Sequence, residues 1–592
     1  MPSGDNLEIE ERGGAPLIRR LLTTTIHPPS RPLYPRARFT VSTQTISPEA
    51  GFPTLPTDSK RPRLVARKRP TLHILQPNVT YTGAPIQALQ KGLPKQTESL
   101  CPECGKVIRA DIFAVEGKVV MEKSCAEHGH FRDIVFSDVE LYLKMEEWNF
   151  GDNLGLSNPQ VEGGTSCPAD CGLCSMHTSH TALANVDLTN RCNLTCPVCY
   201  ANANVAGYLY EPSLEQVRTM LATLRGERPV DGRVVQFSGG EPTIHPEFFE
   251  ILSMAREMGF THIQAATNGI ELANLEFARS AKAAGLATLY LQFDGVTDDI
   301  YRRVRGQALL DVKMRVIENC RATGMKIVFV PTIVKGLNDH QIGDIVRVAI
   351  ENIDTVSGIS FQPVAFTGRI AKHELLAKRF TLADLARCVS EQTGITDPRA
   401  DWFPLACVTP FSKFTAALRG TGVPTISSHP HCSLGTYFFV DERSKQAVPI
   451  TRFVDVPNML QDMEELSRTA AKARFKLYSK VKAWNRLQKH FKPQFAPPGL
   501  TFAKFLQTLQ GLTNKKLGRD GKDGTFTYRT LLVAGMHFQD AYNYDIERVK
   551  RCVIHYATPD GKLYPFCTYN SGPCYREKIE RQFSVPWERG SN

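Results

Sequence analysis

The sequence of 592 residues has no run of 18 or more apolar residues, which excludes a helix that spans a membrane. Its start, MPSGDNLEIEERGGAPL, contains no continuous apolar segment, so we expect no secretory signal. With 42% hydrophobic and 22% charged residues, the chain cannot be a wholly disordered protein, a collagen or a coiled coil. We therefore expect a cytoplasmic protein made of globular domains.

The main body also lacks a strong net charge. Residues 1–95 hold 14 Lys/Arg and 6 Asp/Glu, a balance of +8, and only +3 of the total of +11 remains for the rest of the chain. A nearly neutral body is poor evidence for binding to nucleic acid, and we expect no nucleic-acid partner.

The first 95 residues have no cysteine and no tryptophan, but they hold 14 of the 38 prolines and the basic run KRPRLVARKRP at 60–70. This composition predicts a mostly disordered, basic, proline-rich arm. The arm either tethers or targets the protein, or it is a dispensable extension that results from a start codon placed too far upstream.

From residue 182 to about residue 395, short apolar runs alternate with amphipathic stretches. The runs predict six strands, at 184–190, 234–240, 262–269, 288–295, 326–334 and 358–366. The stretches between them predict five helices, at 212–226, 245–259, 274–285, 309–324 and 341–353. This α/β pattern predicts a parallel sheet, either a partial barrel or a doubly wound sheet, with its chemistry at the carboxyl ends of the strands.

Residues 458–492 have the pattern of one long helix. Between Arg468 and Lys492 there are nine Lys/Arg and no acid. Apolar residues recur there every three or four positions: Phe475, Tyr478, Val481, Trp484, Leu487 and Phe491. Such a helix suits an anionic membrane surface or lipid headgroups, or it packs on its own domain with its basic face in water. The final segment, 525–585, has no clear periodicity.

The 16 cysteines are too sparse for a disulfide scaffold, and in a reducing cytosol clustered cysteines are typical of metal sites. The densest cluster is Cys192-x3-Cys196-x2-Cys199, directly after the first predicted strand. Three thiolates within eight residues can hold one iron–sulfur cluster and leave one iron free to chelate a small molecule. A structural zinc site is the alternative, but it normally closes with a fourth Cys or His ligand.

A second C-x3-C-x2-C motif lies upstream, formed by Cys167, Cys171 and Cys174. Because it precedes the sheet, we expect it to hold an auxiliary iron–sulfur cluster, with zinc as the alternative. Its fourth ligand is not apparent, and His177 or a distant cysteine are the candidates.

A third group, Cys101-x2-Cys104 with Cys125-x2-His128, is a complete set of four ligands. It suits zinc or a single iron of the rubredoxin kind, with His130 as a substitute for His128. We expect a structural role, and electron relay is the alternative.

Seven cysteines remain. Cys320 and Cys388 fall within helical patterns and are expected to be small buried residues. The favoured ligands of a third cluster are Cys407, Cys432, Cys552 and Cys567. Cys574 is a reserve ligand, or the missing ligand of the second motif.

Residues 182–395 resemble the radical S-adenosylmethionine (SAM) superfamily. The resemblance is carried by the Cys192 motif with Tyr200 directly after it, followed by Ser238-Gly239-Gly240-Glu241-Pro242 at the end of the next predicted strand. It implies a partial (β/α)6 barrel in which Cys192, Cys196 and Cys199 hold the catalytic [4Fe-4S] cluster. Reductive cleavage of SAM would give methionine and a 5′-deoxyadenosyl radical that abstracts hydrogen from the substrate.

The same resemblance implies a set of cofactor-binding residues. The glycines would let the backbone approach SAM closely because they lack Cβ atoms, and Glu241 would lie near the amino group of SAM. The strand-end residues would line the cavity, or are ordinary polar residues at strand ends. The whole set is Tyr200, Ser238, Gly239, Gly240, Glu241, Thr267, Asn268, Gln292, Asp294 and Thr332.

A narrower resemblance, from about residue 99 to 580, is to a radical SAM subfamily that includes the archaeal tetraether lipid synthases. Some of its members are assigned as pterin methyltransferases. The resemblance implies three [4Fe-4S] clusters, of which two are auxiliary, and one mononuclear Fe or Zn. It also implies C–H activation and C–C bond formation between lipid alkyl chains, with an anionic phospholipid as substrate, ferredoxin or flavodoxin as electron donor, and peripheral contact with the membrane.

The expected organisation has five parts: a basic arm (1–95), a rubredoxin-like metal domain (96–150), an auxiliary iron–sulfur segment (151–181), the radical SAM core (182–395) and a C-terminal auxiliary-cluster and basic-helix region (396–592). Three alternatives to lipid coupling stay open. They are a methyltransferase of a pterin-like small molecule, a peptide-modifying radical SAM enzyme, and a non-enzymatic metal protein that binds nucleic acid.

Overall fold

The computed structural model describes residues 88–151, 155–204, 206–368, 375–473, 476–513 and 528–586. All of them fall within one unit of the chain that begins at Thr80. Most of the basic arm at 1–95 therefore lies outside the described residues, and its disorder stays a prediction. The first strand already begins at Lys95.

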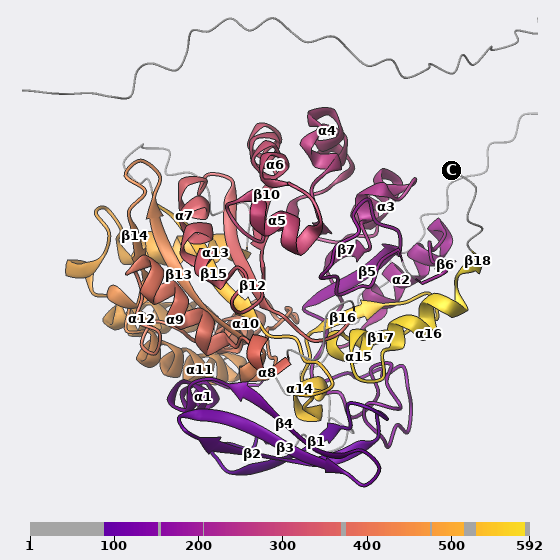
Figure 1. The fold of residues 1–592 in the computed structure, drawn as a ribbon. Helices are drawn as coiled ribbons and strands as arrows, with labels where there is room; N and C mark the ends of the chain where they lie inside the picture. The colour runs from indigo at the N-terminus through magenta and orange to yellow at the C-terminus, as the bar shows by residue number, and fades with distance from the viewer. Residues whose placement is uncertain are drawn as a thin grey trace, which may run out of the picture. The chain divides into compact units, whose positions relative to one another are not determined.

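Parallel strands form the centre of the largest sheet (Figure 1). In spatial order they are β5 (Leu183–Thr189), β7 (Val234–Gly239), β8 (His262–Thr267), β9 (Thr288–Gln292), β10 (Lys326–Val330) and β12 (Val356–Pro363). Each overlaps one predicted strand, so the predicted α/β class and the parallel sheet are confirmed. All carboxyl ends face the same edge of the sheet, where the chemistry was expected.

The predicted helices connect these strands. They are α2 (Leu214–Gly226), α3 (Phe248–Glu257), α4 (Leu275–Ala284), α6 (Leu310–Thr323) and α7 (Ile342–Glu351). Local sequence sets their ends: Ser213 and Gln216 form a capping box before α2, and Asn274 caps α4. A short helix that the sequence pattern did not predict, α5 (Asp298–Arg305), lies between β9 and α6.

Strands from beyond residue 430 extend the sheet at both edges, so it stays open instead of closing into a barrel. β15 (Tyr528–Met536) pairs in parallel with β12, and β16 (Ile554–Ala557) pairs in parallel with β5. The outer strands are β13 (Ser433–Asp441), β14 (Ala447–Pro449) and β17 (Leu563–Pro565). In Figure 1 the yellow C-terminal strands lie on both sides of the central strands.

A separate antiparallel sheet is formed by β1 (Lys95–Leu100), β2 (Val107–Val115), β3 (Lys118–Cys125) and β4 (Gly129–Phe136), followed by α1 (Val139–Glu147). Arg379 attaches it to the rest of the unit, because this buried guanidinium bridges Asp133 on β4 and Asp540 in the C-terminal region. Lys123 donates to the carbonyl of Ala541 at 2.7 Å.

The prediction of one long helix at 458–492 is wrong. The segment forms two helices, α11 (Val456–Lys472) and α12 (Lys476–Leu487), because the backbone turns extended at Ala473. The apolar residues of the predicted helix do not share one buried face. Leu487 and Phe491 are buried, whereas Tyr478, Val481 and Trp484 are exposed. Phe475 lies outside the described residues.

The remaining elements are short or peripheral. They are β6 (Tyr208–Leu209), β11 (Thr332–Ile333), α8 (Leu375–Lys378), α9 (Leu382–Thr393), α10 (Thr409–Arg419), α13 (Phe502–Thr513), α14 (Ile546–Lys550), α15 (Phe566–Asn570), α16 (Tyr575–Gln582) and β18 (Val585–Pro586). Within the described part of the chain, no helix is both long enough and apolar enough to cross a bilayer.

Candidate active site and metal centres

The loop after β5 carries Cys192, Cys196 and Cys199, which belong to one small apolar cluster. Asn204, which sequence reasoning missed, fastens this loop. Its Oδ1 accepts from the Cys192 amide at 2.9 Å, and its Nδ2 donates to the carbonyls of Cys192 and Leu194 at 2.8 and 3.0 Å. Asn204 has φ = 66°, in the left-handed region that asparagine tolerates better than most residues. A side chain therefore fixes the loop before any metal binds.

Gly239 and Gly240 press the end of β7 against this cysteine loop. A Cβ on Gly239 would lie 2.3 Å from the carbonyl oxygen of Thr189, and one on Gly240 would lie 2.0 Å from that of Arg191. The Gly240 amide donates to Thr189 at 2.7 Å. Close approach of the protein's own backbone accounts for both glycines, and their predicted role in the approach to SAM stays a prediction.

Glu241 joins three strand ends in a buried network. Its Oε1 accepts from Thr267 Oγ1 at 2.7 Å, and its Oε2 accepts from the Asn268 amide at 2.8 Å. Asn268 Nδ2 in turn lies 3.9 Å from Cys192 Sγ. Burial raises the pKa of the Glu241 carboxyl. Both carboxylate oxygens have donors within the protein, so Glu241 fixes the geometry of this edge.

Asp294, at the end of β9, forms the other half of the site with Arg305 of α5. Arg305 Nε and Nη2 each donate to an Asp294 oxygen at 2.8 Å, and Nη1 donates to the carbonyl of Val198 in the cysteine loop at 3.0 Å. The Thr332 amide also donates to Asp294, at 3.0 Å. Arg305 hydrogen-bonds to Cys196, although burial raises the pKa of that thiol overall. Sequence reasoning missed Arg305.

Lys313, on α6, is also absent from the predicted set. Its side chain is fully buried, and its Nζ donates to the Asn268 carbonyl and lies 3.3 Å from Gln292 Oε1. Burial lowers the pKa of Lys313 to about 7. The described structure gives the Lys313 amino group no carboxylate partner within ion-pair distance. Its neighbours are these two carbonyl oxygens and the ring of Tyr301, whose centroid is 5.8 Å away.

Tyr200 and Ser238 connect the loop to the C-terminal region. The Tyr200 ring stacks on Phe566 with 5.6 Å between centroids, and its hydroxyl is buried without a hydrogen-bond partner among the described residues. Ser238 Oγ donates to Asp187 at 2.7 Å, and Asp187 pairs with Arg576 of α16.

The second cysteine motif lines a small, partly open pocket. Cys167, Cys171 and Cys174 lie in its wall together with His177 and Lys550. Burial raises the pKa of the Cys171 thiol to about 12. His177 Nε2 is already 2.9 Å from the Cys552 carbonyl and 3.1 Å from His555 Nε2, so this nitrogen faces the protein.

Three C-terminal cysteines gather near Arg548. Burial raises the pKa of the Cys567 thiol to about 11, and the neighbouring Cys432 adds to the rise. Burial likewise raises the pKa of Cys552, with Cys567 and Cys432 contributing. Arg548 Nε donates to Cys432 Sγ at 3.5 Å. These cysteines come from distant parts of the chain.

Cys407 was expected in this group of cysteines, but it lies elsewhere. It lies in a separate apolar cluster with residues of α11, because the short turn that carries it packs beneath that helix. Cys574 stands at the start of α16. Cys320 is fully buried in α6, as predicted, and Cys388 is half-buried in α9.

The N-terminal sheet brings four predicted ligands together. The ligand atoms of Cys101, Cys104, Cys125 and His128 all lie within 4.8 Å of one another. His128 Nδ1 is 3.5 Å from Cys125 Sγ and 3.7 Å from Cys101 Sγ. Ligands about 2.0–2.3 Å from one tetrahedral metal have separations of this size. His130 instead points to Ser124, at 3.3 Å, and is no substitute.

Comparisons with known proteins match two of these regions and most of the chain. The model of the radical SAM superfamily matches residues 186–349, and that of the HMPTM N-terminal zinc ribbon domain matches residues 93–137. The 7,8-dihydro-6-hydroxymethylpterin dimethyltransferase of Methanocaldococcus jannaschii is 43% identical over 500 residues, which cover 84% of this chain and 97% of the relative. The chain belongs to the radical SAM superfamily, in the family of this dimethyltransferase.

Two further proteins resemble the chain over shorter stretches. The Fe-coproporphyrin III synthase of Methanosarcina barkeri is 31% identical over 189 residues, which are 31% of this chain and 45% of the relative. The solved structure of SuiB from Streptococcus suis matches 36% of this chain and 46% of its own, with 20% identity and a TM-score of 0.29.

A radical SAM enzyme binds a [4Fe-4S] cluster and SAM, and the cysteine loop fits that cluster. Within the described residues, only the ribbon ligands are all close enough together for a single ion. Cys192, Cys196 and Cys199 are spaced more widely, although they share one apolar cluster. The zinc ribbon, in turn, suits one mononuclear metal.

Proposed function

We propose that this radical SAM enzyme methylates a pterin-like, fused-ring small molecule. The observation that carries the proposal is the 43% identity to a pterin dimethyltransferase over 97% of the length of that relative. The model that matches the N-terminal sheet also bears the HMPTM name. The similarity to this relative extends from the zinc ribbon through the radical SAM core. It therefore favours the reaction of the relative more strongly than similarity of the core alone would.

When bound, the cluster and SAM supply a carbon radical that removes hydrogen from C–H bonds beyond the reach of acid–base groups. Cys192, Cys196 and Cys199 would hold the cluster on a loop that Asn204 keeps in place. Lys313, whose buried amino group lies at the strand ends without a carboxylate partner in the described structure, would bind the carboxylate of SAM. The strand-end residues that would line the same cavity are Thr267, Asn268, Gln292, Asp294 and Thr332.

We assign auxiliary clusters to the two other groups of cysteines, one formed by Cys167, Cys171 and Cys174, the other by Cys432, Cys552 and Cys567. One cysteine of each group, Cys167 and Cys567, packs in the same apolar cluster as Tyr544. The fourth ligand of each cluster would be the substrate or another side chain.

The test is a reaction under anaerobic conditions with SAM, a reductant and 7,8-dihydro-6-hydroxymethylpterin. We expect 5′-deoxyadenosine together with pterin products that are heavier by one and two methyl groups. Cys196→Ala should abolish both products, and Cys388→Ala, outside every site, should retain them. Cleavage of SAM by the native protein without any methylated pterin would contradict the pterin proposal while leaving the radical SAM assignment intact.

A second candidate is the joining of lipid alkyl chains, which one observation favours. Helix α12 exposes Leu477, Tyr478, Val481 and Trp484 beside several lysines, as a protein with a lipid substrate would. Lipid extracts from an expression host that makes suitable precursors would contain coupled chains, of about twice the carbon number, only if this reaction takes place. Methylated pterin with unchanged lipids would support the first candidate.

A further inference from the structure

Helix α12 has apolar side chains on two opposite faces. Ala483 and Leu487 lie on the inner face and are buried, where the helix packs against α11. Arg486 also turns inward, and its Nη2 pairs with Asp462 at 2.6 Å and with Glu465 at 2.5 Å. These contacts attach α12 to α11 through its inner face and do not involve the outer face.

The outer face consists of Leu477, Tyr478, Val481 and Trp484, and we call it the α12 face. These side chains are 74%, 67%, 52% and 41% exposed. The spacing of Leu477, Val481 and Trp484, at i, i+4 and i+7, aligns them along one side of the helix. Apolar residues that are so exposed and so well aligned are typical of an interaction surface.

Aromatic neighbours extend the α12 face. The Trp484 ring meets Phe502 of α13 edge to face, with 5.0 Å between centroids. Phe495, between the two helices, is 59% exposed. Trp484 is therefore held in a fixed orientation by Phe502 while a large part of its ring stays accessible.

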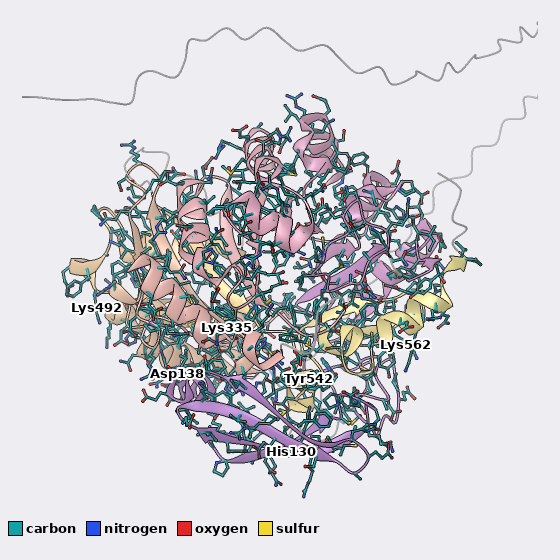
Figure 2. All side chains as sticks on the ribbon, in the orientation of Figure 1. His130, Asp138, Lys335, Lys492, Tyr542 and Lys562 are labelled. Atoms are coloured by element: carbon teal, nitrogen blue, oxygen red, sulfur yellow. The ribbon has the colours of Figure 1, made fainter. Side chains whose placement is uncertain are left out.

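Lysines surround the α12 face. Lys480 lies within it, and Lys489 and Lys492 follow its C-terminal end; Figure 2 shows Lys492 at the left edge of the ribbon. No carboxylate among the described residues forms an ion pair with any of the three. The acids of α11 are instead occupied on the inner side, by Arg486 and by His490, which is 2.8 Å from Asp462.

We propose that the α12 face docks the protein on the surface of an anionic lipid bilayer, with the helix lying in the plane of the interface. Apolar side chains would enter the boundary between headgroups and acyl chains, Trp484 and Tyr478 would lie at the level of the headgroups, and the lysines would meet lipid phosphates. This inference does not depend on the identity of the substrate.

The chemistry of the face favours a bilayer over other partners. A nucleic acid would satisfy the lysines but would leave Leu477 and Val481 exposed to water. A second copy of the chain on a twofold axis would place the lysines of both copies around one shared interface, and the repulsion between like charges opposes association. Only an anionic apolar surface satisfies both kinds of side chain at once.

The first test is flotation of the full-length, cluster-loaded protein with vesicles. Vesicles of phosphatidylglycerol and phosphatidylcholine should bind the protein, and pure phosphatidylcholine should bind it at least tenfold less. Val481→Asp combined with Leu477→Asp, and separately Lys480→Glu combined with Lys489→Glu, should each reduce binding at least tenfold. The matched control, Leu143→Asp with Lys118→Glu, changes an exposed leucine and an exposed lysine on the N-terminal part and should bind normally.

The second test follows Trp484 itself. Trp148 and Trp402 are buried, so in a Trp587→Phe protein the emission that shifts to shorter wavelength on anionic vesicles should be that of Trp484. Brominated lipids should quench this emission. SAM cleavage should be unchanged in every α12 variant, which separates this result from the proposed function. Equal flotation of the α12 variants and the native protein would overturn the proposal, as would a change in oligomeric state as their only effect.

Discussion

The guanidinium of Arg305 holds both carboxylate oxygens of Asp294, with Nε and Nη2 each 2.8 Å from one of them. Both side chains are almost completely buried. A third donor of the same guanidinium reaches the Val198 carbonyl in the cysteine loop. The pair therefore connects the end of β9 to the loop that would carry the catalytic cluster. Its planar, two-pronged geometry cannot be reproduced by a lysine.

Arg305→Lys should consequently lower SAM cleavage at least tenfold while the protein still folds. The charge that neutralises Asp294 is kept, but the contacts with Asp294 and Val198 cannot both be made. The measurement is the initial rate of 5′-deoxyadenosine formation, together with the electron paramagnetic resonance spectrum of the reduced cluster. Arg321→Lys, in an exposed pair with Asp354, is the matched control. A native rate and spectrum in Arg305→Lys would show that the connection has no role.

Lys313 should make SAM binding depend on pH. Burial lowers its pKa to about 7, so the ammonium group is charged below that pH and neutral above it. If it binds the carboxylate of SAM, the contribution of Lys313 to affinity should be largest near pH 6 and decline as the pH rises to 9. Anaerobic equilibrium dialysis of the native protein and of Lys313→Met would give the dissociation constant of each for SAM. The constant of the variant should be about tenfold larger at pH 6. The same ratio at every pH would refute the assignment.

The sequence predicted the parts of this site that follow from spacing. The cysteine triplet and the strand-end residues Glu241, Asn268 and Asp294 are found where the alternation of strands and helices placed them. Arg305 was missed because α5 itself was not predicted, and Lys313 was missed because a basic residue in a helical pattern normally faces water. Only the packing of α5 and α6 over the strand ends turns these side chains inward, and that is a tertiary effect.

In the C-terminal region, the sequence pattern did not predict where the elements of the fold lie. β16 is four residues long and fully buried, too short for a periodic pattern to identify it, yet it completes one edge of the sheet. The separation of α11 from α12 also escaped detection, because helical periodicity continues through the sequence around Ala473. In both places long-range pairing decides the structure, and a local pattern carries no information about it.

Glu227 should make the stability of the protein depend on pH in a definite direction. Burial raises its pKa from 4.5 to about 7, since Oε2 is buried without a partner in the described structure and only Oε1 accepts a bond, from the Thr181 amide at 2.7 Å. Between pH 4.5 and 7 the folded state binds more protons than the unfolded state, so the free energy of unfolding falls as the pH rises through this window.

Glu227→Gln removes this titration. It should therefore increase the free energy of unfolding at pH 8 by about 1–3 kcal/mol, and the gain should vanish near pH 4.5. Denaturant unfolding at the two pH values measures the difference. Glu215→Gln changes an exposed residue in the first turn of α2, the helix that ends just before Glu227. It should have almost no effect on the free energy of unfolding at either pH. A loss of stability at pH 8 in Glu227→Gln would contradict the raised pKa.

His128 should be the fourth metal ligand of the N-terminal sheet, and His130 should not. His128→Ala should remove most of the mononuclear metal, lower the thermal midpoint and leave the iron of the clusters in place. His130→Ala should keep its full content of the mononuclear metal, because the His130 ring contacts only Ser124 among the described residues. Metal analysis of the two purified variants decides the matter, and it also identifies the ion. Equal loss of metal in both would mean that the ligand set is assigned wrongly.

The two cysteines that the structure separates, Cys407 and Cys432, should differ in their effect on iron content. Cys432 lies with Cys552 and Cys567 beside Arg548, whereas Cys407 is packed among apolar residues under α11. If the first group holds a [4Fe-4S] cluster, Cys432→Ser should lower the iron content by about four atoms per chain. Cys407→Ser should leave it unchanged, at a cost in stability of about 1 kcal/mol for a hydroxyl placed in an apolar cluster. Iron and sulfide analysis of anaerobically purified protein measures both. Loss of a cluster in Cys407→Ser alone would restore Cys407 as a ligand and exclude the grouping around Arg548.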